Sequence, residues 1–222
     1  MSLRIITGRA GTGKSTFVHK EIVQDLIDFP LGPPIFMLVP DQMTFQTEYE
    51  LTNKYGLKGI MRAQVLTFKR LAWFILQETG GIAREKVDAV GYRMMLRRIL
   101  EEHKEEFTLF KNAAGKPGFT KEIEKLLKEF SQYNVSTQTV DVLIAQLQMQ
   151  NASQTLLSKM KKKKIVLTQL EAQLGTGFID GDGFFETLVE KLPQSKSIQD
   201  AHIYLDGYMA FTGQEFELLK VL

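Results

Sequence analysis

Hydrophobic residues near the start of the chain form short runs that alternate with helical spacing. Leu3–Thr7 and Ile35–Val39 are mainly apolar runs of the kind that form strands buried in a parallel sheet. Between them Val18, Ile22 and Leu26 recur at four-residue spacing, which predicts one face of a helix. Strands that alternate with helices in this way indicate an α/β fold with a parallel sheet.

The alternation continues to about residue 79. Phe45 and Tyr49 indicate a helix after the second strand, and Gln64–Leu66 predict a third strand. Thr67 then begins a helix that carries Leu71. This part of the chain therefore continues the parallel α/β pattern.

From about residue 80 to 195 the spacing is helical, and no clear strand is predicted. Four segments each place their apolar residues on one helical face. These faces are Tyr92, Leu96, Ile99 and Leu100; Phe119, Ile123, Leu126, Leu127 and Phe130; Val140, Leu143, Ile144 and Leu147; and Leu156, Met160, Leu167, Leu170 and Leu174. We therefore expect an all-helical insertion.

The insertion interrupts the α/β pattern, which resumes after it. We expect residues 1–79 to form the first part of one domain, 80–195 the helical insertion, and 196–222 the second part. Gln214–Leu222 has the pattern of an amphipathic helix without a stop signal. The chain is therefore expected to be a fragment of a longer protein.

The segment between the first strand and its helix has the sequence GRAGTGKS, Gly8–Ser15, which fits G-x-x-x-x-G-K-[ST]. Its glycines let successive N–H groups form an anion nest, and the next helix points its positive end at the same place. In this motif Lys14 stabilises the β/γ-phosphates and Ser15 ligates Mg²⁺. The predicted ATP-binding residues are Gly8, Arg9, Ala10, Gly11, Thr12, Gly13, Lys14, Ser15 and Thr16.

A second nucleotide motif is expected at the end of the strand His202–Asp206. Enzymes with this loop hold Mg²⁺ with an Asp, on a strand expected beside the loop strand. We expect Asp206 and Ser15 to bind the same ion. The alternative is that Asp206 is only a turn residue at the end of the strand, before Gly207.

The machinery for ATP hydrolysis looks incomplete. Many helicase motors place a Glu directly after the Mg²⁺-binding Asp, to orient the attacking water, and here that position is Gly207. Glu215 lies nearby in sequence and is the candidate to replace it. The sequence therefore supports binding of a nucleoside triphosphate but predicts poor hydrolysis.

Composition limits which binding partners and which cellular compartment we expect. Lys and Arg number 28 against 26 Asp and Glu, so a net charge of +2 gives no strong global attraction to nucleic acid or membrane. No apolar run is long enough to span a membrane. An ATP site without an export signal predicts a cytoplasmic protein. With no cysteine, the 222 residues hold no thiolate metal site.

Four stretches together resemble one family. They are Gly8–Ser15; Val39–Gln46, followed by Glu48; Val65–Ala72; and Leu205–Glu215, which is similar to D-G-F-x-x-F-T-P-Q-E. The chain resembles the N-terminal part of the AddB subunit of the bacterial AddAB helicase–nuclease. Gly213 stands where the family tends to have Pro, and Asp41 where it tends to have Glu.

The resemblance implies a superfamily-1 helicase-like fold, in which a RecA-like P-loop domain 1A is interrupted by a helical domain 1B. It implies an AddA-type partner in a heterodimer, and DNA ends that are unwound and resected in double-strand break repair by recombination. The family's nuclease site and iron–sulfur cluster are expected outside this chain.

Two basic segments are candidates for DNA contact. Thr67, Lys69 and Arg70 lie at a strand–helix junction, where a helix N-terminus attracts phosphate. Lys161–Lys164 is the densest charge run, and we interpret it as a solvated face, with DNA contact left open.

Two other function classes remain open at this point. One is a small-molecule P-loop kinase, although a kinase usually has an uninterrupted small sheet and a lid that carries arginines. The other is a non-catalytic scaffold that binds nucleotide.

Overall fold

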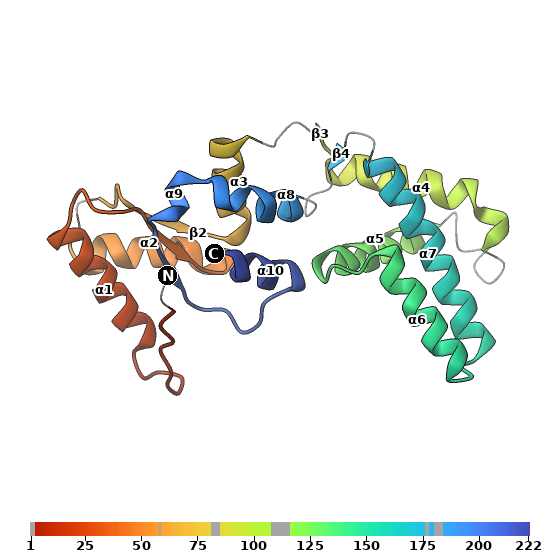
Figure 1. The fold of residues 1–222 in the computed structure, drawn as a ribbon, viewed down its shortest axis with the longest axis horizontal. Helices are drawn as coiled ribbons and strands as arrows, with labels where there is room; N and C mark the ends of the chain where they lie inside the picture. Colours follow the sequence, from red (N-terminus) through yellow and green to blue (C-terminus); the bar gives the residue numbers. More distant parts are fainter. Residues whose placement is uncertain (1–2, 58, 81–84, 108–115, 176–177, 180–183) are drawn as a thin grey trace. The chain divides into compact units, whose positions relative to one another are not determined.

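The computed structural model describes residues 3–57, 59–80, 85–107, 116–175, 178–179 and 184–222. The chain forms two compact units, which Figure 1 colours by sequence. Unit 1 comprises Met1–Gly80, Glu190–Phe211 and Val221–Leu222, and unit 2 comprises Gly81–Val189 and Thr212–Lys220. Their assignment to helicase domains 1A and 1B stays a prediction.

Unit 1 contains a parallel sheet in the order β2 (Ala63–Leu66), β1 (Ile35–Leu38) and β5 (His202–Leu205). Every residue of β1 is at most 1% exposed, because this strand has a neighbour on both edges. Ile35 pairs with Ala63 on one side and with His202 on the other. The parallel α/β fold predicted from the sequence is therefore confirmed.

Unit 1 also contains helices, some of which pack on this sheet. They are α1 (Lys14–Asp28), η1 (Asp41–Met43), α2 (Thr44–Tyr49), the π-helix η2 (Glu50–Lys54), α3 (Phe68–Thr79), η4 (Leu192–Gln194) and α9 (Lys196–Gln199). One core cluster consists of buried side chains from α1, η2, β1 and β2 and the residue after β1, namely Val18, Ile22, Val23, Ile35, Met37, Val39, Leu51, Ala63 and Val65. The helices expected after the second strand and at Thr67 are confirmed as α2 and α3.

The predicted first strand is wrong. Leu3–Thr7 has no strand conformation, and the side chains of Leu3 and Ile5 are 87% and 73% exposed. Only Ile6 packs against the core, and an ion pair between Arg4 and Glu21 ties the segment to α1. An apolar run becomes a strand only when a neighbouring strand pairs with it, and in unit 1 β5 pairs with β1 instead.

Unit 2 is built mainly from helices. They are α4 (Ala89–Glu102), η3 (Lys104–Glu106), α5 (Pro117–Gln132), α6 (Thr137–Met149), α7 (Gln154–Gly175) and α10 (Gly213–Val221), and α8 (Phe184–Lys191) runs from unit 2 into unit 1. The expectation of no strand is corrected by a short parallel pair, β3 (Glu85–Lys86) with β4 (Phe178–Ile179).

The predicted helical faces supply most of the core of unit 2. Its buried residues are Tyr92, Leu96, Ile99, Leu100, Phe107, Leu127, Val140, Ile144, Leu157, Met160, Val166, Leu167 and Leu170. The solvated face expected for the lysine run on α7 is corrected at one position, because Lys162 is only 7% exposed, whereas Lys161 is exposed. Lys164 Nζ also lies 2.6 Å from Asp141 Oδ1, so this run helps to hold α7 against α6.

Candidate functional site

The glycine-rich loop leads directly into α1. Gly11 and Gly13 have φ angles of 79° and 86°, in the left-handed region that favours glycine. A Cβ atom at either position would meet nothing within 4 Å, so backbone conformation rather than crowding requires glycine. Residues 8–13 are exposed, and the loop is therefore open to a ligand.

The N-terminus of α1 has the properties that an anion requires. Its N-cap is Gly13, no side chain caps its N–H groups, and its first turn holds no acidic residue. Lys14 Nζ folds back over the loop and donates to the carbonyl oxygens of Gly8 at 2.9 Å and Arg9 at 2.8 Å. Uncapped N–H groups next to an ammonium group fit a phosphate chain, since both supply positive charge.

Asp206 comes directly after β5. Its N–H donates to Leu38 O at 3.1 Å, so Asp206 continues the ladder with β1. Side chains alternate along a strand, so Asp206 lies on the same face as Tyr204 and His202. That face carries α1, because Tyr204 Oη donates to Glu21 Oε1 at 3.1 Å. The two predicted Mg²⁺ ligands, Asp206 and Ser15, thus belong to elements that pack on each other.

One expectation about Asp206 is corrected. We expected its strand to lie beside the loop strand Leu3–Thr7, but β5 pairs with β1. Asp206 therefore lies at the end of an edge strand that pairs with β1, on the sheet face that meets α1. Its negative charge acts on the ring of His19, one turn after Ser15 on α1.

His19 is a feature that the sequence did not reveal. Its ring is buried, and neither nitrogen has a hydrogen-bond partner; Glu50 Oε2 lies 3.4 Å from Nδ1 but without hydrogen-bond geometry. Burial lowers the pKa of His19, and the carboxylates of Glu50 and Asp206 only partly oppose it. The ring therefore favours its neutral form.

Polar contacts hold α1 against β5. Burial, and then the charge of Glu21, raise the pKa of Tyr204 to about 12, so its hydroxyl remains a donor. Burial alone would raise the pKa of Asp25, but bonds from His202 and Arg62 outweigh it and hold that pKa below its usual value. The sequence gives no local signal for these pairs, because their partners lie far apart along the chain.

Gly207 has a structural reason to lack a side chain. Its φ of 79° is left-handed, and an added Cβ would overlap the Met43 sulfur and lie 3.3 Å from Pro40 Cδ. A glutamate at this position would therefore require Met43 to move. The left-handed backbone and the nearby Met43 side chain thus both favour glycine directly after Asp206.

Glu215, the candidate to replace that group, caps a helix. Its Oε2 accepts from Thr212 N at 2.8 Å, and its own N–H donates to Thr212 Oγ1 at 3.2 Å. This reciprocal pair is a capping box at the start of α10. The spacing T-x-x-E is visible in the sequence, where it could have predicted the cap.

The predicted DNA-contact residues surround the N-terminus of α3. Thr67 is buried, and its hydroxyl accepts from Arg70 N at 3.3 Å, so it acts as the N-cap. Lys69 and Arg70 are exposed. Phe68 packs against Tyr208 and Phe211, with ring centroids 5.2 and 6.1 Å away. Two of the sequence motifs, Val65–Ala72 and Leu205–Glu215, are therefore in contact.

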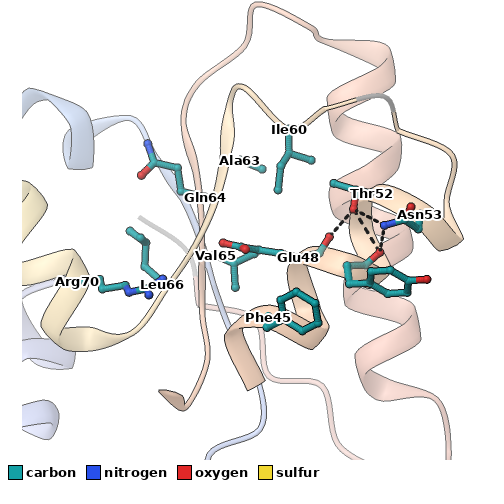
Figure 2. A pocket seen from close by; sticks show the side chains of 11 residues that line it. Phe45, Glu48, Thr52, Asn53, Ile60, Ala63, Gln64, Val65, Leu66 and Arg70 are labelled. Atoms are coloured by element: carbon teal, nitrogen blue, oxygen red, sulfur yellow. Dashed lines mark hydrogen bonds between the residues drawn. The ribbon is translucent and has the colours of Figure 1, made fainter. Parts of the chain in front are cut away.

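An open pocket of about 530 Å³ lies between α2, η2 and β2, with Arg70 at one side (Figure 2). In Figure 2 Glu48 projects from α2 toward Val65, while Gln64 lies on the opposite side of β2. Phe45 is 77% exposed. The glycine-rich loop does not line this pocket.

Comparison with known proteins identifies the family. Residues 5–222 match the family described as "ADDB, N-terminal". The chain belongs to the AddB family. It is 54% identical to the B subunit of the ATP-dependent helicase/deoxyribonuclease of Lysinibacillus sphaericus over 222 residues. The proteins of the same name from Anoxybacillus flavithermus and Desulforudis audaxviator are 43% and 40% identical, over 224 and 222 residues. Each alignment covers 100% of this chain and 19% of the relative.

Two further observations bear on this AddB-family site. Within the described ranges, no three His, Asp or Glu side chains gather where they could hold a metal ion. A Mg²⁺ ion that is bound through substrate phosphates needs only one or two protein ligands, so a Ser–Asp pair suffices for it.

No helix in the described part of the chain is long and apolar enough to cross a membrane.

Proposed function

We propose that this AddB-family chain binds ATP with Mg²⁺ at the loop Gly8–Thr16. The backbone N–H groups at the start of α1 and the Lys14 ammonium hold the phosphates. Ser15 and Asp206 are the protein ligands of Mg²⁺, which neutralises phosphate charge when it is bound. The observation that carries this proposal is the exposed left-handed glycine loop in front of an uncapped helix N-terminus.

We further propose that this chain holds ATP without efficient hydrolysis. Hydrolysis needs a group that orients the attacking water. Gly207 has no side chain, and the carboxylate of Glu215 is engaged in the cap of α10. Nucleotide binding then acts mainly by stabilising the folded state. The free energy of unfolding rises by RT ln(1 + [L]/Kd), where [L] is the free nucleotide concentration.

At the level of the whole protein, we propose a subunit of a heterodimeric ATP-dependent helicase/deoxyribonuclease. The names of its relatives and the family match support this role. It would act in the cytoplasm with an AddA-type partner, on DNA ends that are unwound and resected for recombination. The nuclease site and the iron–sulfur cluster would lie outside these 222 residues.

Lys69 and Arg70 are proposed as DNA-phosphate contacts. Both are exposed in the first turn of α3, where the helix N-terminus also attracts phosphate. Thr67 contributes as the cap that fixes this turn. Such contacts predict DNA binding that weakens as salt rises.

Titration of the full chain with fluorescent mant-ATP tests the nucleotide proposal. Lys14→Ala should raise the Kd for Mg-ATP by at least about tenfold, since it removes a charge-assisted contact to phosphate. Lys20→Ala is the matched control, because Lys20 is an exposed lysine on the same helix. Equal affinities for the wild type and Lys14→Ala would contradict the proposal.

Phosphate release during the same titration separates the function classes. Binding without release is the expected result. Rapid release that Lys14→Ala abolishes would contradict poor hydrolysis, and phosphate transfer to a small-molecule acceptor would favour the kinase alternative.

A further inference from the structure

Two carboxylates on α1 meet two residues of β5 at matching intervals. Tyr204 Oη donates to Glu21 Oε1 at 3.1 Å, and His202 Nδ1 lies 2.9 Å from Asp25 Oδ2. Glu21 and Asp25 are four residues apart on one helical face, and His202 and Tyr204 are two apart on one strand face. Four helical residues rise about 6 Å and two strand residues about 6.6 Å, so the two spacings fit each other.

The direction of these contacts fixes how α1 lies on β5. The later strand residue, Tyr204, meets the earlier helix residue, Glu21, so the two elements run antiparallel. Flanking contacts hold both carboxylates in place. Arg4 forms an ion pair with Glu21, and Arg62 Nη2 lies 3.0 Å from Asp25 Oδ1.

Continuing the same register leads to the candidate metal ligands. Asp206 is two residues beyond Tyr204, so it lies at the level of Phe17, four residues before Glu21. Ser15 is two residues nearer the start of α1, about 3 Å of helical rise, and it shares the sheet-facing side of the helix with Val18 and Ile22, at i+3 and i+7. A shift of α1 by one turn would move Ser15 by about 5.4 Å, too far for both oxygens to bind one ion.

We propose that the pairs Glu21–Tyr204 and Asp25–His202 form a register clamp that positions Ser15 opposite Asp206 for a shared Mg²⁺. This inference rests on the proposed function of the loop. The four residues are positioning residues, because they act through the register of α1 and touch neither nucleotide nor metal. The clamp therefore affects only the part of nucleotide affinity that depends on Mg²⁺, whereas the glycine loop and Lys14 bind the phosphates directly.

Removal of a single hydroxyl tests the clamp. In the full chain, Tyr204→Phe deletes the bond to Glu21 and keeps the ring in the core. We expect the gain in mant-ATP affinity that Mg²⁺ gives over EDTA to fall by about fivefold, while the affinity in EDTA stays the same. Glu21→Ala, which also removes the ion pair with Arg4, should cause at least this loss, and adding Tyr204→Phe to it should cause little further change, because the bond to Tyr204 is already gone.

The control removes a comparable bond elsewhere in unit 1. Ser195 Oγ donates to Glu78 Oε2 at 2.6 Å, and neither residue belongs to α1 or β5. Ser195→Ala should leave both affinities unchanged, and thermal melting verifies that each variant is folded at the assay temperature.

The outcomes separate the clamp from the proposed function. A Tyr204→Phe variant with the wild-type Mg²⁺ gain, or with equal losses in Mg²⁺ and EDTA, would overturn the clamp while nucleotide binding stands. A wild type whose affinity does not depend on Mg²⁺ would overturn both.

Discussion

At the residue scale, Gly207 shows how backbone conformation limits chemistry. The residue directly after the candidate Mg²⁺ ligand is left-handed and packs against Met43 and Pro40. A side chain at this position would be strained by its φ angle and would require Met43 to move. The proposed lack of turnover thus has a structural cause at a single position.

Gly207→Ala should destabilise unit 1 by about 1–2 kcal/mol, because an L-residue is strained at this φ. Urea unfolding followed by the fluorescence of Trp73, the only tryptophan, measures the change. Gly59→Ala is the control, since its Cβ would have no neighbour within 4 Å and its φ is not left-handed. An unchanged midpoint for Gly207→Ala would refute this explanation.

His19 predicts a pH dependence of the same unit. Burial lowers its pKa in the folded state, whereas the unfolded chain takes up the proton near about pH 6.5. The unfolded state therefore binds more protons below that pH, and stability falls as the pH drops toward the lower folded pKa.

Replacement of His19 by a side chain that does not titrate tests whether His19 causes this loss of stability at lower pH. His19→Gln should reduce the loss of unfolding free energy between about pH 7.5 and 5.5 that Trp73 fluorescence records for the wild type. The nearby charges of Glu50, Asp206 and Lys54 stay in place in this comparison. An equal or larger loss in His19→Gln would be inconsistent with a buried neutral ring.

At the element scale, patterns along the chain predicted most helices but not the sheet neighbours. The apolar faces of α4 to α7 could be predicted from the sequence, because the spacing of apolar residues repeats within each segment. The conformation of Leu3–Thr7 could not be predicted, because strand formation depends on which distant segment pairs with it. The same reason hides the contacts of Glu21 and Asp25 with β5, 177 to 183 residues away.

The local sequence signals that identified the glycine-rich loop were stronger than those for strand pairing. Gly11 and Gly13 have the left-handed backbone that the motif requires, and the helix begins at Lys14 as the motif places it. Thr67 and Glu215, in contrast, were assigned chemical roles although their spacings also fit caps. In the structure, helix capping occupies both side chains.

The start of α10 gives an element-scale prediction for Glu215. Glu215→Ala should destabilise α10 by about 0.5–1 kcal/mol, while Glu215→Gln should cost less, because glutamine also completes a capping box. Amide hydrogen exchange along α10 measures both effects. If Glu215→Gln instead abolished measurable ATP turnover with no effect on exchange, a catalytic role would replace the structural one.

At the scale of the whole molecule, each unit has its own core, and the candidate nucleotide site belongs to unit 1 alone. The site is assembled from the two parts of unit 1 that the helical segment separates in sequence. Loop and α1 come from the first part, and Asp206 from the second. We therefore expect these two parts to hold one Mg-ATP jointly.

The Mg²⁺-dependent ATP affinity of an Asp206→Asn variant shows whether the second part of unit 1 contributes to binding. We expect the Kd for Mg-ATP to rise by at least about tenfold, with the Kd in EDTA unchanged, because only the metal contact is lost. Asp41→Asn, an exposed aspartate shortly after β1, should behave as the wild type. An Asp206→Asn variant that binds Mg-ATP as tightly as the wild type would show that Asp206 does not share the ion with Ser15.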